Sequence, residues 1–240
     1  MPSASRPPRA DAAILTVTSA RASDRGLDLG RDPGLDPFVG GGEMAELMRS
    51  IDWSTTAVGP VSSWPQSLRT ALSIINASGY PMYLAWGPDF VQFYNDAFRP
   101  ILGATKHPAA MGGSTRTTFA EIWDAIRPLF ERVLSEGEQT YLEDALFPLD
   151  RNGFLEECYF TFSYSAIREE TGRVGGVLVT CLETTGRVLG ERRLRLLGDL
   201  ALAAPGVTPA EAAARAAAVL ATEPRDLPFA LVYLLEEDGE

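Results

Sequence analysis

The chain has 240 residues, of which 45% are hydrophobic and 22% charged, and its formal net charge is −11. This composition is ordinary for a globular protein with a buried core, and the length allows one large domain or two small ones. The acidic balance argues against non-specific binding to nucleic acid or to an anionic membrane surface.

The two cysteines and the lengths of the apolar runs indicate where the protein resides. Cys158 and Cys181 both lie inside apolar runs, which excludes a disulfide scaffold and suits a reducing compartment. No apolar run approaches the roughly 20 residues that a membrane-spanning helix needs. The apolar run at residues 12–17 is too short for a signal peptide. We therefore predict a cytoplasmic protein.

The N-terminal part divides into a tail and a helical lead-in. Residues 1–42 are rich in proline and glycine and have little to bury, so we expect a disordered tail. Within the lead-in, residues 43–80, apolar residues at helical spacing predict a helix over residues 43–52 and a second helix further on. Trp53 and Trp64 are predicted to be packing anchors. The apolar face of the second helix comprises Leu68, Ala71, Leu72 and Ile75.

Two apolar runs around a tight turn predict a β-hairpin near the middle of the chain. Residues 82–86 and 90–94 are rich in aromatic and apolar residues, and a Gly-Pro-Asp turn separates them. Asn95 is predicted to cap the helix that follows, since its side-chain oxygen can accept a hydrogen bond from an N–H two or three residues on. Pro100 predicts that this helix is short or distorted.

A longer helix and three strands follow the hairpin. Apolar positions at helical spacing predict a helix over residues 118–133, with Thr117 or Thr118 as its cap and Glu121 placed for a capping box if Thr118 is the cap. The second of the three strands alternates apolar and polar residues, which predicts a half-buried antiparallel strand. The three strands are expected over residues 139–147, 157–166 and 174–182.

Taken in this order, the strand, tight turn, strand, capped helix, longer helix and three further strands resemble a PAS domain. The resemblance covers residues 43–185, and the order of elements is more specific than any one motif. It implies an α+β fold with a five-stranded antiparallel sheet and helices inserted between the second and third strands. The PAS sensor domain would occupy residues 81–185, after the lead-in.

Several short motifs carry a narrower resemblance. Asp52-Trp53-Ser54, Gly59-Pro60, residues 63–69 (SWPQSLR) and residues 106–112 (KHPAAMG) resemble segments of a class of bacterial sensor histidine kinases. The resemblance implies that the chain belongs to a two-component phosphorelay protein.

The end of the last strand resembles a PAS output junction. Glu183-Thr184-Thr185 is similar to the acidic-x-Thr motif by which PAS domains continue into an output helix, with Glu in place of the commoner Asp. A signalling helix is predicted over residues 187–204, within a linker of residues 186–205. A coiled coil needs apolar residues at alternating spacings of three and four along one face of the helix. Arg193 occupies one of these positions, so the coiled-coil pattern is incomplete. The other positions of this face are Leu189, Leu196, Leu200 and Ala203.

Residues 206–240 resemble the first pieces of a GAF domain. Thr208, Pro209 and Glu211 form a complete helix start, followed by an alanine-rich helix to about residue 221. An apolar strand is predicted over residues 227–235. One helix and one strand cannot close a GAF sheet, so we interpret the chain as a fragment, or a gene cut short, of a longer multidomain sensor.

His107 is the only histidine, so it must carry any histidine chemistry. A haem ligand and a phospho-acceptor are the functional alternatives to a loop histidine with a local hydrogen bond. The residues that follow it lack the acidic neighbour and the helix of a kinase histidine box, which favours the loop histidine. Neither Cys158 nor Cys181 lies in the Asn-Cys-Arg-Phe motif of flavin-binding light-oxygen-voltage domains, which argues against that photochemistry.

The PAS resemblance implies a cavity between the inner face of the sheet and the inserted helices. Aromatic residues fill protein interiors whether or not a ligand binds, so core packing is the alternative to a ligand site. The sequence specifies no cofactor, and it contains no metal-ligand spacing, nucleotide loop or catalytic set. By position, six residues are predicted to face the cavity: Tyr83, Tyr94, Trp123, Phe160, Phe162 and Cys181.

We therefore predict a sensory and regulatory module of a two-component protein, a sensor histidine kinase whose catalytic domain lies outside these residues. It would form a homodimer through its N-terminal and signalling helices and act on downstream kinase domains of the parent chain. Nucleic acid and membrane are not expected partners, and a small-molecule ligand is left open. The alternative is a ligand-free PAS dimerisation scaffold in a phosphatase or cyclase. A third hypothesis is that the chain is an enzyme in its own right, but the sequence shows no set of catalytic residues.

Overall fold

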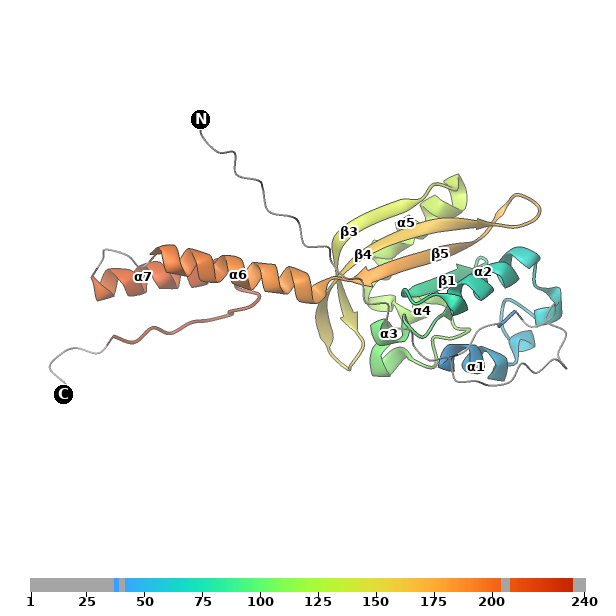
Figure 1. Cartoon of the computed structure of the whole chain (residues 1–240), viewed down its shortest axis with the longest axis horizontal. Coiled ribbons are helices and arrows are strands. Elements are labelled where there is room, and N and C mark those ends of the chain that lie inside the picture. The colour runs from blue at the N-terminus through green and yellow to red at the C-terminus, as the bar shows by residue number, and fades with distance from the viewer. Residues whose placement is uncertain (1–36, 39–41, 204–207, 235–240) are drawn as a thin grey trace, which may run out of the picture. The chain divides into compact units, whose positions relative to one another are not determined.

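The computed structural model of the chain describes residues 37–38, 42–203 and 208–234. Within these ranges, five antiparallel strands form one sheet in the order β2-β1-β5-β4-β3 (Figure 1). With helices inserted between β2 and β3, this is the predicted α+β PAS fold. The tail expected over residues 1–42 lies almost wholly outside the described residues. The strands are β1 (Met82–Trp86), β2 (Val91–Tyr94), β3 (Thr140–Asp150), β4 (Leu155–Arg168) and β5 (Val174–Glu183).

The hairpin β1–β2 is formed as predicted, and its turn contains two residues with left-handed backbone angles. Gly87 has a φ of 69° and Phe90 a φ of 54°. A phenylalanine rarely adopts this conformation, because its Cβ crowds the backbone. Burial holds Phe90 there, since its ring lies 5.3 Å from that of Phe130. The turn is thus fixed by the core beneath it as well as by its own sequence.

The region between β2 and β3 forms three helices, and the single helix predicted over residues 118–133 is wrong at its start. A 3-10 turn, Ala120–Ile122, interrupts the helical pattern. Glu121 cannot close a capping box with Thr118, because its carboxylate contacts the Lys106 ammonium and accepts a hydrogen bond of 3.1 Å from the Asp150 N–H. The three helices are α3 (Arg99–Lys106), α4 (Thr115–Thr118) and α5 (Trp123–Glu136).

Helix α3 is short and distorted, as expected, although Pro100 is not where it breaks. Pro100 lies in the first turn, where its missing N–H interrupts no helical hydrogen bond. The break is at Gly103, whose φ of 61° and ψ of −157° are not helical. This backbone lets the Arg151 carbonyl accept hydrogen bonds from the N–H groups of Ala104 and Thr105, at 2.9 and 3.2 Å.

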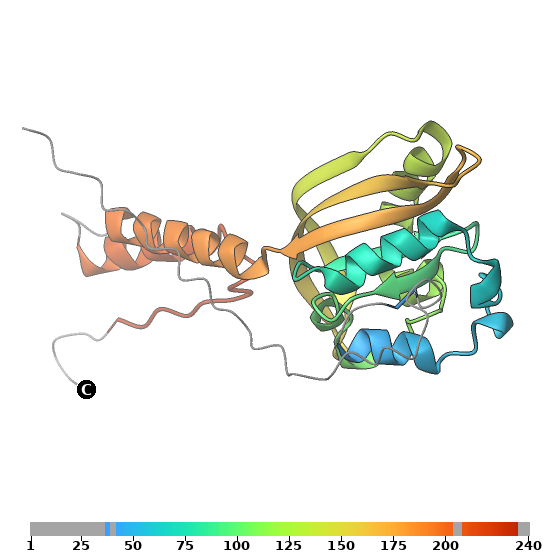
Figure 2. The ribbon, with the colours of Figure 1, turned by 45° about the vertical axis from the view of Figure 1, so that its right-hand side comes forward.

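The N-terminal lead-in packs on the face of the sheet opposite to α5 (Figure 2). It consists of α1 (Glu43–Ser50), two 3-10 turns and α2 (Gln66–Ala77). The ring of Phe93 in β2 lies 4.7 Å from that of Trp53 and 5.4 Å from that of Trp64. Both tryptophans are buried, so their predicted role as packing anchors is confirmed.

After the sheet, α6 (Thr185–Ala203) and α7 (Pro209–Leu220) lie side by side (Figures 1 and 2). Helix α7 begins with the predicted capping box, in which Thr208 Oγ1 accepts from the Glu211 N–H and the Glu211 carboxylate accepts from the Thr208 N–H.

The strand predicted over residues 227–235 is not formed over residues 227–234, and residue 235 lies outside the described part. None of the described strands pairs with this segment. A β-strand needs a neighbour to complete its backbone hydrogen bonds, so an apolar composition is not sufficient on its own. The α/β piece expected at the C-terminal end is therefore a helix followed by irregular chain.

Candidate functional site

A cavity of about 50 Å³ lies between the inner face of the sheet and the inserted helices. On a comparable measure a water molecule needs roughly 10–15 Å³, and an engineered cavity of roughly 150 Å³ binds benzene. In this conformation the cavity therefore holds only a few atoms. It is lined by Tyr83, Phe98, Ile101, Phe119, Ile122, Ile126, Phe147, Leu149, Phe160, Phe162, Tyr164, Val179 and Cys181.

The cavity walls carry no charged side chain, which restricts the chemistry that the cavity can accept. Burial raises the pKa of Tyr83 and of Tyr164 well above the ordinary value, so both hydroxyls stay neutral. Burial also raises the pKa of the Cys181 thiol to about 12, so it is no thiolate nucleophile or metal ligand at neutral pH. A charged molecule would be desolvated here without a counter-charge.

One polar group at the cavity wall is left without a hydrogen bond. The Tyr83 hydroxyl is buried and has no partner of normal hydrogen-bond geometry among the described residues. Thr115 lies beside it, but donates its own hydroxyl proton to the Phe90 carbonyl at 3.0 Å. A water molecule or a ligand atom that satisfied this hydroxyl would be stabilised by it.

The structure brings four of the six predicted cavity residues together: Tyr83, Phe160, Phe162 and Cys181. Strand alternation explains this, because Phe160 and Phe162 share one face of β4, and Cys181 of β5 pairs with Phe162. The same alternation could have identified Tyr164 and Val179. The lining residues from α3, α5 and the intervening turns have no comparable pattern, because their orientation depends on how each helix packs.

Tyr94 and Trp123 do not line the cavity. The Tyr94 hydroxyl lies 2.9 Å from Nδ1 of His107, beyond the cavity wall. Trp123 packs with its ring 5.5 Å from that of Phe90, and the guanidinium of Arg116 lies 5.6 Å from the Trp123 ring centre. Both predictions fail because an aromatic residue that faces the interior can pack against neighbouring side chains without reaching the cavity.

His107 is a loop histidine with local contacts. Besides Tyr94, it faces Glu43 of α1, with Nε2 3.7 Å from the carboxylate. Burial and the nearby Arg99 lower the pKa of His107, against a smaller opposite effect of Glu43. Within the described residues, no group of three or more His, Cys, Asp or Glu side chains could hold a metal ion.

Asn95 joins the hairpin to the lead-in, and the prediction that it caps the following helix is wrong, because Phe98 stands at the N-cap of α3 and no described side chain caps that helix. Its side-chain oxygen accepts from the N–H of Phe98 at 3.1 Å, which caps the turn before α3. Its amide nitrogen donates to the carbonyls of Ile75, Ser78 and Tyr80 at 2.7–3.1 Å. These carbonyls belong to the end of α2 and the loop after it, a contact that no sequence pattern indicates.

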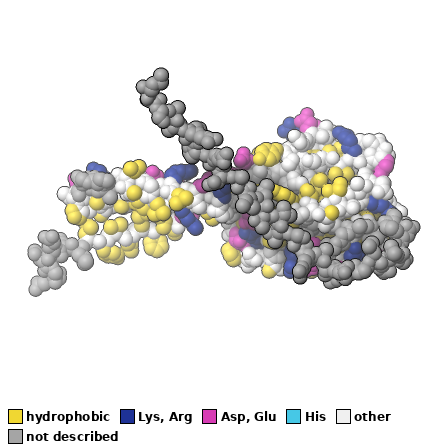
Figure 3. Space-filling model, in the orientation of Figure 1, with side chains coloured by type: hydrophobic (Ala, Val, Ile, Leu, Met, Phe, Trp, Pro, Cys, Tyr) yellow, Lys and Arg dark blue, Asp and Glu magenta, His cyan; other side chains and the backbone are white. Residues whose placement is uncertain are grey.

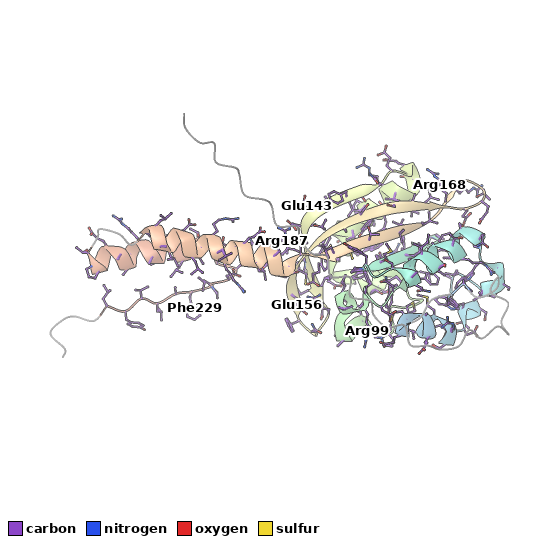
Figure 4. All side chains as sticks on the ribbon, viewed as in Figure 1. Arg99, Glu143, Glu156, Arg168, Arg187 and Phe229 are labelled. Carbon is purple, nitrogen blue, oxygen red and sulfur yellow. The ribbon has the colours of Figure 1, made fainter. Side chains whose placement is uncertain are left out.

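The junction between β5 and α6 is held by contacts from β3, β4 and the turn between them. Arg151 binds Glu183 through two hydrogen bonds of 2.8 and 2.9 Å, and Thr185 Oγ1 donates to Glu183 at 3.0 Å. Thr185 Oγ1 also accepts from the Tyr159 N–H at 2.9 Å. Arg187, labelled in Figure 4, lies on the first turn of α6 and forms an ion pair with Asp144 of β3. Sequence reasoning placed the junction but did not identify these partners.

Among the described helices, none is both long and apolar enough to cross a membrane. Cys158 and Cys181 are buried in β4 and β5, as their apolar surroundings predicted.

No protein-family model and no curated protein matches the chain. Solved structures to which the chain is similar include an RNA-binding light-oxygen-voltage receptor (22% identity, TM-score 0.39), the PAS domain of BvgS from Bordetella pertussis (18%, 0.41) and a sensory box sensor histidine kinase from Vibrio cholerae (13%, 0.34). The matches cover 61%, 55% and 49% of this chain and 40%, 97% and 89% of those proteins. The chain thus spans 40% of the length of the light-oxygen-voltage receptor.

At these identities the similarity concerns the fold alone. The assignment of a PAS fold rests on the molecule itself, namely the strand order β2-β1-β5-β4-β3 and the helices between β2 and β3. The chain therefore consists of a PAS fold with a small apolar cavity, followed by two paired helices.

Proposed function

We propose that the chain is the sensory module of a two-component signal-transduction protein, a sensor histidine kinase, and that it relays the state of its cavity through α6. The observation that carries the proposal is that the same two strands form the cavity wall and hold the output helix. Phe160 and Cys181 line the cavity, while Tyr159 and Glu183, one and two residues away, bind the first turn of α6.

The wider context of the module remains part of the proposal. The motifs of the lead-in and of residues 106–112 support a histidine kinase parent, and the helix start at residue 208 supports a following GAF domain. On this proposal the protein acts in the cytoplasm as a homodimer and controls the kinase domains of its parent chain. The net charge of −11 supports partners other than nucleic acid.

The relay can be tested by filling the cavity. Val179 lines the cavity, whereas Val177, two residues earlier on the same face of β5, is buried in ordinary core. We expect Val179→Leu to fold normally and to change hydrogen exchange along residues 185–203. Val177→Leu is the matched control, because it adds the same methylene group to core that does not line the cavity. This overpacking should lower the free energy of unfolding by about 1–3 kcal/mol. If exchange in α6 is the same in Val179→Leu as in the unaltered chain, the relay does not operate.

A ligand-free dimerisation scaffold is the second candidate, and two observations favour it. The cavity holds only about 50 Å³, and α6 exposes an apolar stripe that includes Leu194 and Leu197, 70% and 61% exposed. Native mass spectrometry and an absorption spectrum of the purified chain separate the candidates. A stoichiometric bound molecule supports the ligand sensor, and a dimer without any bound molecule supports the scaffold.

A further inference from the structure

Arg192 is a buried arginine on a helix outside the core of the sheet. Its side chain is 7% exposed, whereas that of its neighbour Arg193 is 65% exposed. An arginine is almost never buried unless it is paired, because the guanidinium is desolvated.

The partners of Arg192 come from two segments that are far apart in sequence. Its Nη1 and Nη2 donate to Glu157 of β4 at 2.7 and 3.2 Å, and its Nε donates to Asp226, beyond the end of α7, at 3.0 Å. Hydrogen bonds from Arg192 lower the pKa of both carboxyl groups, so both are ionised at neutral pH. A planar guanidinium can serve two carboxylates at once in this way, which an ammonium group cannot match.

Apart from the contacts of Arg192 and an ion pair of 3.4 Å between Arg225 and Glu157, the segment that Asp226 anchors has little attachment. Helix α7 is rich in alanine and has no buried residue. An apolar groove of about 240 Å³ lies between its C-terminal end and residues 224–230, so the packing there is incomplete. Hydrophobic side chains remain exposed over this part of the chain (Figure 3), and Phe229 (Figure 4) is 79% exposed. With so little burial, the ion pairs of Arg192 and Arg225 carry much of the attachment.

Glu157, the partner of Arg192 on the sheet, is connected to the cavity through its neighbours on β4. The Tyr159 hydroxyl donates to Glu157 at 2.7 Å, and the Arg225 guanidinium lies 3.3 Å from the same hydroxyl. The next residue, Phe160, points the other way and lines the cavity. A shift of β4 at Phe160 therefore moves the carboxylate that Arg192 binds.

We propose that Arg192 is a latch that holds α7 and the segment after it against α6 as long as β4 presents Glu157. When β4 shifts, Glu157 no longer holds the guanidinium of Arg192 in the orientation that Asp226 accepts, and its ion pair with Arg225 is lost as well. The C-terminal hairpin of α6 and α7 then opens. Opening uncovers the face of α6 around Leu196, which is buried but does not belong to the core of the sheet. The latch itself follows from the contacts described above, and its control by the cavity rests on the proposed function.

The latch is tested by hydrogen exchange of the full chain, read at residues 209–220. Asp226→Asn removes the charge on the hairpin side and leaves Glu157 and the sheet intact. We expect exchange in α7 to rise by roughly tenfold or more, the effect of weakening charge-assisted hydrogen bonds. Arg192→Gln should have at least the same effect. Arg195→Gln, an exposed arginine of the same helix, is the matched control and should leave α7 unchanged.

Exchange at the core amides of β4 and β5 serves as an internal measure of folding and should stay constant in Asp226→Asn. Equal exchange of α7 in Asp226→Asn, Arg192→Gln and the unaltered chain would overturn the latch. Comparing the single variants Val179→Leu and Asp226→Asn separates a failure of the latch from a failure of the proposed function. If Asp226→Asn opens α7 while Val179→Leu changes nothing in α6 or α7, the latch stands and the cavity relay fails.

Discussion

The guanidinium of Arg151 and the carboxylate of Glu183 form a bidentate ion pair, with N–O distances of 2.8 and 2.9 Å. The pair ties the turn between β3 and β4 to the last residue of β5, immediately before α6. Arg151 also binds Glu156 at 3.1 Å, so three segments meet at one guanidinium.

Arg151→Lys should destabilise the fold by about 1.5–3 kcal/mol, since an ammonium group cannot reproduce both hydrogen bonds. Denaturant unfolding measures this loss. The double variant Arg151→Lys with Glu183→Gln should lose little more than the single variant, because the two residues share one interaction. Fully additive losses would show that the two residues act independently.

The acid dependence of this pair follows from the pKa of Glu183. Burial raises it, but the hydrogen bonds from Arg151 and Thr185 outweigh burial, so the pKa lies below the ordinary value of 4.5. The stabilisation is therefore present above pH 4.5 and is lost as pH falls through the folded-state pKa. Glu183→Gln should flatten the stability profile in that acid range. An unchanged slope would mean that the carboxylate is not stabilised by folding.

Gly103→Ala should be strongly destabilising, by more than the left-handed backbone alone explains. A Cβ at residue 103 would lie 2.2 Å from the Arg151 carbonyl oxygen, and φ is +61°. Gly87→Ala is the matched control, because φ is +69° there but no atom lies within 4 Å of the added Cβ. The control should cost about 1–2 kcal/mol, and Gly103→Ala should cost more. Equal losses in thermal unfolding would show that the segment at Arg151 can move aside.

Asn95→Asp should destabilise the protein by about 3–5 kcal/mol at neutral pH, because it places an unpaired charge in a buried site. Asn95 is 1% exposed, and its amide nitrogen faces three carbonyl oxygens that would repel a carboxylate. Such surroundings raise the pKa of the new carboxyl group in the folded state. Part of the stability should therefore return as pH falls, which unfolding experiments between pH 7 and pH 4 can detect. A loss that does not depend on pH would exclude the charge as its cause.

His107 should make the fold sensitive to mild acid. Its pKa is lowered from the ordinary value of 6.5 by burial and by Arg99. Such a group contributes stability above the unfolded-state pKa and loses it as pH falls through the folded-state pKa. His107→Gln should therefore reduce the decline in stability below pH 6.5, measured by thermal unfolding. An identical decline in both proteins would assign it to other groups.

Most elements of the fold could be predicted because their patterns are local. Alternating residues on β4, the hairpin turn after Trp86 and the helical spacing in the lead-in each follow from the geometry of one element. Where prediction failed, a partner from elsewhere in the chain decided the outcome. Glu121 binds Lys106 instead of closing a capping box, and residues 227–234 have no strand beside them.

In the candidate site too, local patterns identified some residues, and contacts with distant parts of the chain decided the positions of others. Residues of β4 and β5 were found because strand alternation fixes which side chains face inwards. Tyr94 and Trp123 were misplaced because their rings pack beside the cavity, and that depends on the positions of His107 and Phe90. The buried pairing of Arg192 with Glu157 and Asp226 has no local pattern at all.

By itself, the sequence predicted most of the elements in their order, because backbone preferences and apolar periodicity act over a few residues. Its resemblance to PAS domains implied the topology of the sheet and the place where the last strand continues into a helix. Only the tertiary structure decided the size of the cavity, its lining and the side chains that hold α6. These depend on close packing and on charge pairs between residues far apart in sequence, such as Asp144 and Arg187, which are 43 residues apart. The burial that makes pairs such as Glu157 and Arg192 matter exists only once the chain has folded.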